Sequence, residues 1–170
     1  PHIDLLLYKP TEKYPFWKLV TMGASDIKMN APKNALGDRN EYMMMINPDI
    51  DMTDSAIAQW YFNQLTEVAL YPLREQSFIS CGHSIEWETS EGEEMVGAYL
   101  EFPQIIENTG ILRCKLGWLK TSICLLVVLL TRTEVDELIK NGSESFSYYL
   151  FPNDDSKQHF LCERTRTDKF

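Results

Sequence analysis

The side chains with the clearest capacity for chemistry form two short pairs of cysteine and histidine. Cys81 lies two positions before His83, and His159 lies three positions before Cys162. Thiolates and imidazoles are the ligands of tetrahedral zinc sites, so these four residues are candidate metal ligands. Structural zinc sites more often join Cys-x2–4-Cys to His-x3–5-His, and nothing in this spacing brings the two pairs together. We therefore expect no metal, and assign one pair to a turn and the other to a strand.

A second candidate is the dipeptide Ser25-Asp26 after Gly23, with His83 as a base for the serine. Hydrolases of the α/β class carry their nucleophile in Gly-x-Ser-x-Gly, but Ile27 stands where the second glycine belongs. The 8 glycines of the chain form no phosphate-binding loop either. We predict no catalytic residue and no cofactor, and expect Ser25 and Asp26 to satisfy backbone amides of a loop.

A third candidate is a cluster of carboxylates around Gly92, between two predicted strands. Its members are Glu86, Glu88, Glu91, Glu93 and Glu94. Paired carboxylates can perform acid–base chemistry, but a dense exposed group in a hairpin turn is more often only solvated. The functional alternative is a patch that steers a basic partner, with Glu91, Glu93 and Glu94 as the contact residues.

The overall charge narrows the classes of partner. The chain has 170 residues, with 16 Lys and Arg against 25 Asp and Glu, and a net charge of -9. Such a surface repels phosphate backbones and anionic lipid, so we expect neither nucleic acid nor a membrane as a direct partner. A protein with a basic surface is the better electrostatic match.

Composition predicts one globular domain over residues 1–170, since 44% hydrophobic and 24% charged residues are close to the averages for soluble domains. The most apolar run, Ile123 to Leu130, has only 8 residues, whereas a membrane-spanning helix needs roughly 20. It is typical of a buried strand. The sequence starts with Pro1 rather than Met, and we expect residues upstream of it.

The chain has four cysteines, and a domain of this size folds without disulfide bonds. Cys124 lies inside the most apolar run, and the others are Cys81, Cys114 and Cys162. We expect reduced, mostly buried thiols and a cytoplasmic protein.

Periodicity predicts an α+β fold in which a mixed, mostly antiparallel sheet packs against helices. The predicted strands are His2 to Tyr8, Phe16 to Met22, Glu41 to Asn47, Ser84 to Trp87, Val96 to Phe102, Gly110 to Trp118, Thr121 to Leu130 and Gln158 to Cys162.

The strongest helix prediction covers Ser55 to Leu70, with Thr53 or Asp54 as its N-cap. Its apolar stripe should bury Trp60 and Leu65, and Pro72 should end or kink it.

A second helix is predicted over Glu134 to Lys140. We expect Thr133 to cap it and Gly142 to stop it, with a third short helix over Ser145 to Phe151.

Three stretches together resemble the suppressor of fused family. They are Phe16 to Asp26 continuing through Met29, then Glu41 to Met44, then the helix from Trp60 to Pro72. The first is the most specific of the three. The later order of strands, followed by Leu129 to Thr131 and the helix of Glu134 to Leu138, is similar to the same family, so the resemblance covers nearly the whole chain.

The resemblance implies an α+β domain that acts by binding another protein. The single domain is similar to the bacterial stand-alone form, which is associated with toxin–immunity systems. We therefore expect a non-catalytic module, and specifically an immunity protein that binds and inhibits a toxin. Two alternatives stay open: a metal-dependent or hydrolytic enzyme that uses the Cys/His pairs, and a regulator that sequesters an endogenous protein.

Overall fold

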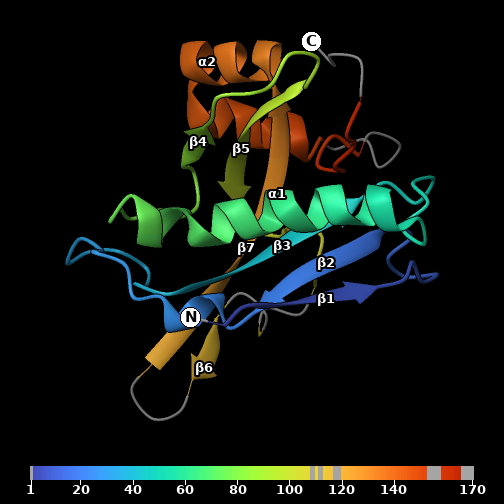
Figure 1. The fold of residues 1–170 in the computed structure, drawn as a ribbon. Coiled ribbons are helices and arrows are strands. Elements are labelled where there is room, and N and C mark those ends of the chain that lie inside the picture. Colours follow the sequence, from blue (N-terminus) through green and yellow to red (C-terminus); the bar gives the residue numbers. More distant parts are fainter. Residues whose placement is uncertain (1, 108–109, 111–112, 117–119, 153–157, 166–170) are drawn as a thin grey trace.

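The computed structural model describes residues 2–107, 110, 113–116, 120–152 and 158–165. Over these residues the chain forms a twisted sheet with one long helix on each face (Figure 1). No helix in this part of the chain is both long and apolar enough to cross a membrane.

Seven strands, two α-helices and one short 3-10 helix make up the described fold. In chain order they are β1 (Asp4–Tyr8), β2 (Trp17–Met22), η1 (Ala24–Asp26), β3 (Asn40–Ile46), α1 (Ser55–Arg74), β4 (Ser84–Glu86), β5 (Met95–Glu101), β6 (Cys114–Leu116), β7 (Lys120–Thr131) and α2 (Arg132–Leu150).

The sheet has the strand order β1-β2-β3-β7-β5-β4, and β6 pairs with the first residues of β7. Only β3 and β7 run parallel, with Tyr42 opposite Leu125; the other pairs are antiparallel. The predicted α+β class with a mixed, mostly antiparallel sheet is therefore confirmed.

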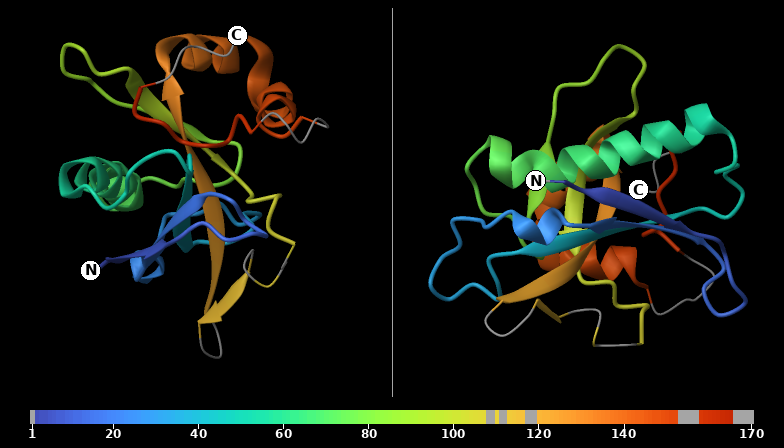
Figure 2. Two further views of the ribbon diagram at one scale, coloured as in Figure 1. Left: turned by 90° about the vertical axis from the view of Figure 1, so that its right-hand side faces the viewer. Right: turned by 60° about the horizontal axis from the view of Figure 1, so that its bottom comes forward.

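Strand β7 is the central strand, as its apolar run predicts. Its side chains alternate between two cores, because successive residues of a strand point to opposite faces. Leu125, Val127 and Leu129 join the core under α1, whereas the intervening Leu126, Val128 and Leu130 join the core under α2. Figure 2 shows the sheet edge-on between the two helices. A strand that is buried on both faces needs no polar alternation, which explains its uniform composition.

Helix α1 begins where the sequence predicts and ends later. The Asp54 carboxylate accepts hydrogen bonds from the amides of Ala56 and Ile57, at 2.8 and 3.2 Å. The helix continues through Pro72 to Arg74, four residues beyond the predicted end. A proline removes one backbone donor, and in the last turn this loss does not stop the helix.

The predicted burial of α1 is half right. Leu65 is fully buried in the core, but Trp60 is only partly buried. The ring of Trp60 packs edge-on against Tyr61, whose side chain is the one that points fully inward. At this position the buried side chain of α1 is therefore Tyr61, one residue after the predicted Trp60.

Helix α2 has a different cap from the predicted one. Thr131, not Thr133, is the N-cap: its hydroxyl accepts from the amide of Glu134, and the Glu134 carboxylate accepts from the amide of Thr131. This is a capping box, which requires an acidic residue three positions after the cap. Gly142 interrupts the helix with a positive φ of 82°, and helical structure resumes and runs to Leu150. The expected stop and short third helix thus appear as one kinked helix.

Two other predicted strands are shorter in the structure. Cys162 makes a single parallel bridge to Ile46, so Gln158 to Cys162 is not a strand. The amide of Cys162 donates to the carbonyl of Met45, which holds the tail beside β3. Of the predicted strand over Gly110 to Trp118, Cys114–Leu116 is observed, and much of the rest lies outside the described residues.

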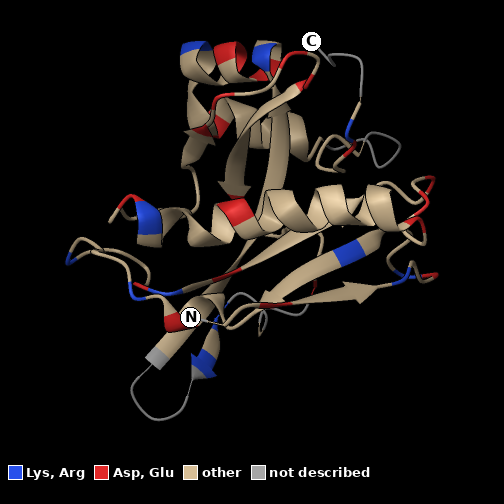
Figure 3. Ribbon diagram, in the orientation of Figure 1, with Lys and Arg blue, Asp and Glu red and all other residues tan. Residues whose placement is uncertain are grey.

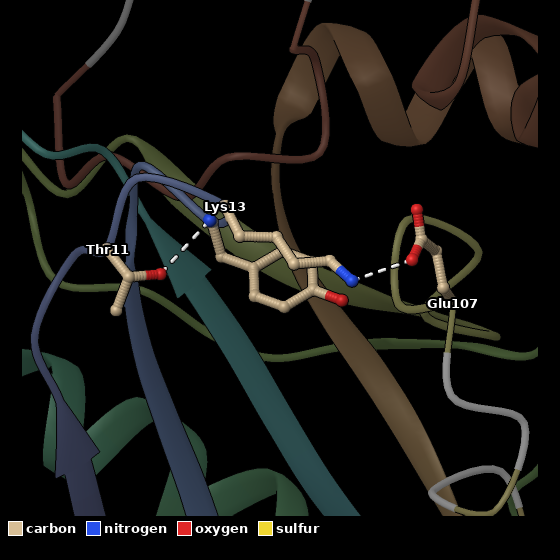
Figure 4. A network of polar contacts seen from close by, with 4 residues as sticks. Thr11, Lys13 and Glu107 are labelled. Atoms are coloured by element: carbon tan, nitrogen blue, oxygen red, sulfur yellow. Dashed lines mark hydrogen bonds and ion pairs between the residues drawn. The ribbon is translucent and has the colours of Figure 1, made fainter.

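Polar contacts also join distant loops. Lys13, in the turn between β1 and β2, reaches Glu107 after β5, with 2.6 Å between Nζ and Oε2 (Figure 4). The Thr11 hydroxyl in the same turn accepts from the amide of Tyr14. Both members of the ion pair are exposed, so we expect it to add little to stability.

Candidate protein-binding groove

The four candidate zinc ligands do not form a metal site. The Cys81 thiol donates to Glu101, with 3.0 Å between Sγ and Oε1, and His83 lies on the surface with its ring edge-on to Phe78. Within the described part of the chain, no group of three His, Cys, Asp or Glu side chains is placed to hold a metal ion.

The other pair is separated in the same way. His159 stacks on Tyr149, with 4.5 Å between ring centroids, and the Cys162 thiol is fully buried and faces the carbonyl of Val127. None of the four cysteines, all of which the structure describes, forms a disulfide; Cys124 and Cys162 are buried, and Cys114 is exposed.

Ser25 is a buried structural residue. Its hydroxyl donates to the Glu41 carboxylate at 2.7 Å, and the same carboxylate accepts from the amides of Gly23, Ala24 and Ser25 at 3.0 to 3.2 Å. The Thr21 hydroxyl also donates to it, at 2.6 Å. Five donors converge on one carboxylate, which therefore caps η1 from the neighbouring strand.

The conformation of Gly23 makes this cap possible. Its φ is 105°, and a Cβ there would lie 2.4 Å from the carbonyl oxygen of His2. Asp26 and His83 are exposed, and the Ser25 hydroxyl donates to Glu41 rather than to His83. The expectation that Ser25 and Asp26 satisfy the loop amides is wrong. Glu41, on β3, accepts from these amides, and the Ser25 hydroxyl donates to the same carboxylate.

Of the carboxylates around Gly92, Glu86 ends β4 and the others lie in the connection between β4 and β5, which projects beyond the sheet on the side of α1 (Figure 2). Gly92 has a positive φ of 88°, typical of glycine in a tight turn. Glu91 and Glu94 are exposed, whereas Glu93 is partly buried against the body of the domain. The three candidate contact residues are therefore not equivalent.

A groove of about 410 Å³ runs between this connection and α1. Its floor and walls include the aromatic rings of Trp60, Tyr71 and Trp87. Four glutamates line it, against one arginine, Arg74: they are Glu67, Glu86, Glu88 and Glu93. Figure 3 shows acidic residues both on α1 and along the β4–β5 connection. The combination of aromatic surface and negative charge favours a cationic, partly apolar ligand.

The contacts of Arg164 show how two residues of the groove, Trp60 and Glu93, hold a guanidinium. Arg164, in the C-terminal segment, lies over the ring of Trp60 at 5.4 Å, and its Nη2 is 3.2 Å from Glu93. Its backbone amide donates to the Tyr61 hydroxyl at 2.9 Å. A cation above an aromatic face and beside a carboxylate combines two attractions that each supply about 0.5–1 kcal/mol at exposed sites.

Glu67 and Glu86 are paired as well. Arg74 contacts Glu67 from the same helix, and Arg132 at the start of α2 contacts Glu86. Both of these pairs are about half exposed, so another basic group can replace Arg74 or Arg132 at low cost. Glu88 makes no ion pair within the described residues.

Most of the sequence matches one family model. The model describes the suppressor of fused protein, and it covers residues 1–159.

The chain belongs to the suppressor of fused family. Domains of this family are generally protein-binding modules and not enzymes. No curated protein matches the sequence.

Solved structures of suppressor of fused proteins have the same fold. A structure of a Sufu–Fu complex superposes with a TM-score of 0.62 at 14% identity, over 97% of this chain and 76% of the other. A suppressor of fused homologue from Neisseria gonorrhoeae gives 0.61 at 14% identity, over 98% and 78%. Drosophila Suppressor of Fused gives 0.64 at 12% identity over 97% of this chain, which spans only 42% of that protein's chain.

Sequence reasoning identified only part of the groove in this suppressor of fused domain. Glu86, Glu88 and Glu93 belong to the acidic cluster, but Trp60 was assigned to the core. Glu67 and Tyr71 lie four residues apart on α1, and this spacing puts them on one helix face. The pairing of an acidic with an aromatic residue, Glu67 with Tyr71 and Trp87 with Glu88, is therefore a sequence signal that could have indicated this groove. No sequence signal indicates that Arg164 lies over Trp60.

Proposed function

We propose that this domain binds a basic segment of a partner protein in the groove between α1 and the β4–β5 connection, and thereby inhibits the partner. The observation that carries the proposal is the Arg164 guanidinium, which lies over Trp60 and beside Glu93, two residues that line the acidic, aromatic groove. An arginine or lysine of a partner meets the same chemistry there. No chemical step is assigned to the domain.

We further propose that the partner is a toxin with a basic surface and that the domain acts in the cytoplasm as its immunity protein. Nucleases and other toxins that act on anionic substrates carry basic clefts, and an acidic binder complements them. The net charge of -9 supports fast association with such a partner. The solved Sufu–Fu complex supports a protein-binding role, because in it a relative is joined to another protein.

The partner can be identified by affinity purification from the native cell with mass spectrometry, followed by a titration of its activity. We expect complete inhibition at a molar ratio of one to one. Sequestration of an endogenous protein in place of a toxin would keep the binding function and reject immunity. Turnover of a substrate by the pure domain, lost in His83→Ala, would reject the whole proposal.

The contribution of the groove is tested with two variants of equal charge. Glu86→Gln, Glu88→Gln and Glu93→Gln together remove three charges from the groove. The control removes three exposed charges elsewhere, through Glu12→Gln, Asp49→Asn and Asp136→Asn.

We expect the groove variant to reduce the association rate constant about tenfold at low salt, and to flatten its salt dependence. The control should change the rate less than threefold. Equal effects of the two variants would show that only net charge matters and would remove the groove from the mechanism.

A further inference from the structure

A second pocket lies on the opposite side of the sheet, at the end of β5. It has a volume of about 510 Å³ and shares no residue with the groove. The turn of Cys81 and Gly82 forms one wall, and the part of α2 that follows the kink at Gly142 forms another. The side chains that line it are Cys81, Tyr99, Glu101, Gln104, Ser147, Tyr148 and others from the same segments.

Glu101 is a buried carboxylate in this pocket, with only 4% of its surface exposed. Its Oε1 accepts from the amide of Phe102 at 2.8 Å and from the Cys81 thiol at 3.0 Å. Neither donor is charged. Among the residues that the structure describes, no lysine or arginine contacts Glu101 or lines the pocket.

The second oxygen of Glu101 is poorly satisfied. The contact of Oε2 within the described chain is the Tyr99 hydroxyl, at a long 3.4 Å. That hydroxyl has one proton and also lies 3.2 Å from the carbonyl of Ser143. When Tyr99 donates to the nearer carbonyl, Oε2 has no donor from the described residues. A buried carboxylate with an unsatisfied oxygen is costly, and a cation is its strongest complement.

The thiol beside Glu101 reports the same environment. Burial, followed by the hydrogen bond to Glu101 and its negative charge, raises the pKa of Cys81 to about 12. The thiol therefore keeps its proton and donates a hydrogen bond to Glu101, and it does not act as a nucleophile.

We propose that this pocket binds an ammonium or guanidinium group carried on a short alkyl chain, with Glu101 as its counter-ion. Oε2 of Glu101, the Gln104 side-chain oxygen and the Ser147 hydroxyl supply acceptors for the several N–H donors of such a group. Tyr99, Tyr148 and Phe151 supply aromatic surface for the alkyl chain and for the cation. A metal ion would need several oxygen ligands, but the pocket has one buried carboxylate.

The test measures binding of n-butylguanidinium and n-butylammonium by the shifts of backbone amides in ¹H–¹⁵N spectra. Neutral n-butanol and anionic butyrate are the controls for apolar binding alone. We expect the two cations to shift amides of Gly82, Phe102 and Ser147, with dissociation constants of about a millimolar or below, because one ion pair with apolar contact supports such an affinity. The absence of saturable shifts at ten millimolar would overturn the proposal.

The matched pair of variants is Glu101→Gln and Glu144→Gln, because Glu144 lines the same pocket but is exposed. A glutamine keeps an acceptor for Phe102 and Cys81, so Glu101→Gln should fold; its unfolding temperature is measured alongside. We expect Glu101→Gln to weaken cation binding at least tenfold and Glu144→Gln less than threefold. Equal weakening by both would overturn the assignment to Glu101. Should Glu101→Gln fail to fold, Tyr148→Ala replaces it, with a threefold or larger loss expected and an unchanged affinity contradicting the proposal.

Two sources of the cation are distinguished by a peptide. If N-acetyl-Gly-Arg-Gly-amide binds as tightly as n-butylguanidinium, the pocket accepts a basic side chain of a protein. If the peptide binds at least tenfold more weakly, the ligand is a free amine or guanidine. Either result supports the pocket, and neither affects the groove, which the variants of Glu86, Glu88 and Glu93 test separately.

Discussion

Replacement of Glu41 with glutamine should destabilise the domain by about 2–5 kcal/mol. Five donors converge on the Glu41 carboxylate: the amides of residues 23, 24 and 25 and the hydroxyls of Thr21 and Ser25. Hydrogen bonds to a charged group each stabilise a fold by about 1.5–3 kcal/mol, and an unsatisfied buried donor costs about 1–3 kcal/mol.

A glutamine side chain at this position has one acceptor oxygen, whereas the glutamate has two. In one amide orientation the NH₂ group faces the Ala24 amide, and in the other it faces the amides of Gly23 and Ser25. Either way at least one donor next to buried Ala24 and Ser25 is left without an acceptor. The remaining bonds lose their charge assistance, and these two losses together give the stated range.

The measurement is urea-induced unfolding, followed by circular dichroism and tryptophan fluorescence. Ser25→Ala, which removes one donor, should cost about 1–2 kcal/mol, and Glu12→Gln on the surface should cost less than about 0.5 kcal/mol. An unchanged dependence of the free energy on urea shows that the unfolded state is the same. A loss below about 1 kcal/mol for Glu41→Gln would refute the argument that this carboxylate holds η1 to the sheet.

Three further predictions concern the core, the groove and the thiols. Leu65→Ala should lower the free energy of unfolding by about 2–5 kcal/mol, whereas Trp60→Ala should lower it by only about 1–2 kcal/mol because Trp60 is half-buried. Equal losses of stability in thermal unfolding would contradict this difference. Arg164→Ala frees the position over Trp60 and should tighten partner binding about threefold to fivefold by calorimetry; weaker binding would mean that Arg164 is itself a contact. With a thiol reagent at pH 8, exposed Cys114 should react first and Cys81 slowly. The pKa of Cys81, about 12, leaves roughly one Cys81 side chain in ten thousand as the thiolate at that pH. The rate of Cys81 modification should therefore rise about tenfold for each pH unit.

Features that depend on neighbours in sequence were predictable. The run from Ile123 to Leu130 specifies a strand buried on both faces, because no polar residue in it can face water. The Asp54 cap and the period of the following residues specify α1. Glycine at positions 23, 92 and 142 marks three places where the backbone takes a positive φ.

Local rules failed where two local signals competed. Thr131 and Thr133 both fit an N-cap, and Glu134 decides for Thr131 because it completes the capping box. Pro72 predicts a helix end, but its missing donor matters less in a final turn that continues to Arg74.

Only the tertiary structure decided which distant residues meet. Glu41 caps a loop 16 residues away, Arg164 lies over Trp60 across the fold, and Glu101 faces Ser143 through Tyr99. No periodicity encodes these pairs, because their separation depends on strand order and on which face each helix covers. Composition and period thus determine the elements and the charge of this domain, whereas its groove and its pocket arise only when the sheet brings β4, β5 and the C-terminal segment to the two helices.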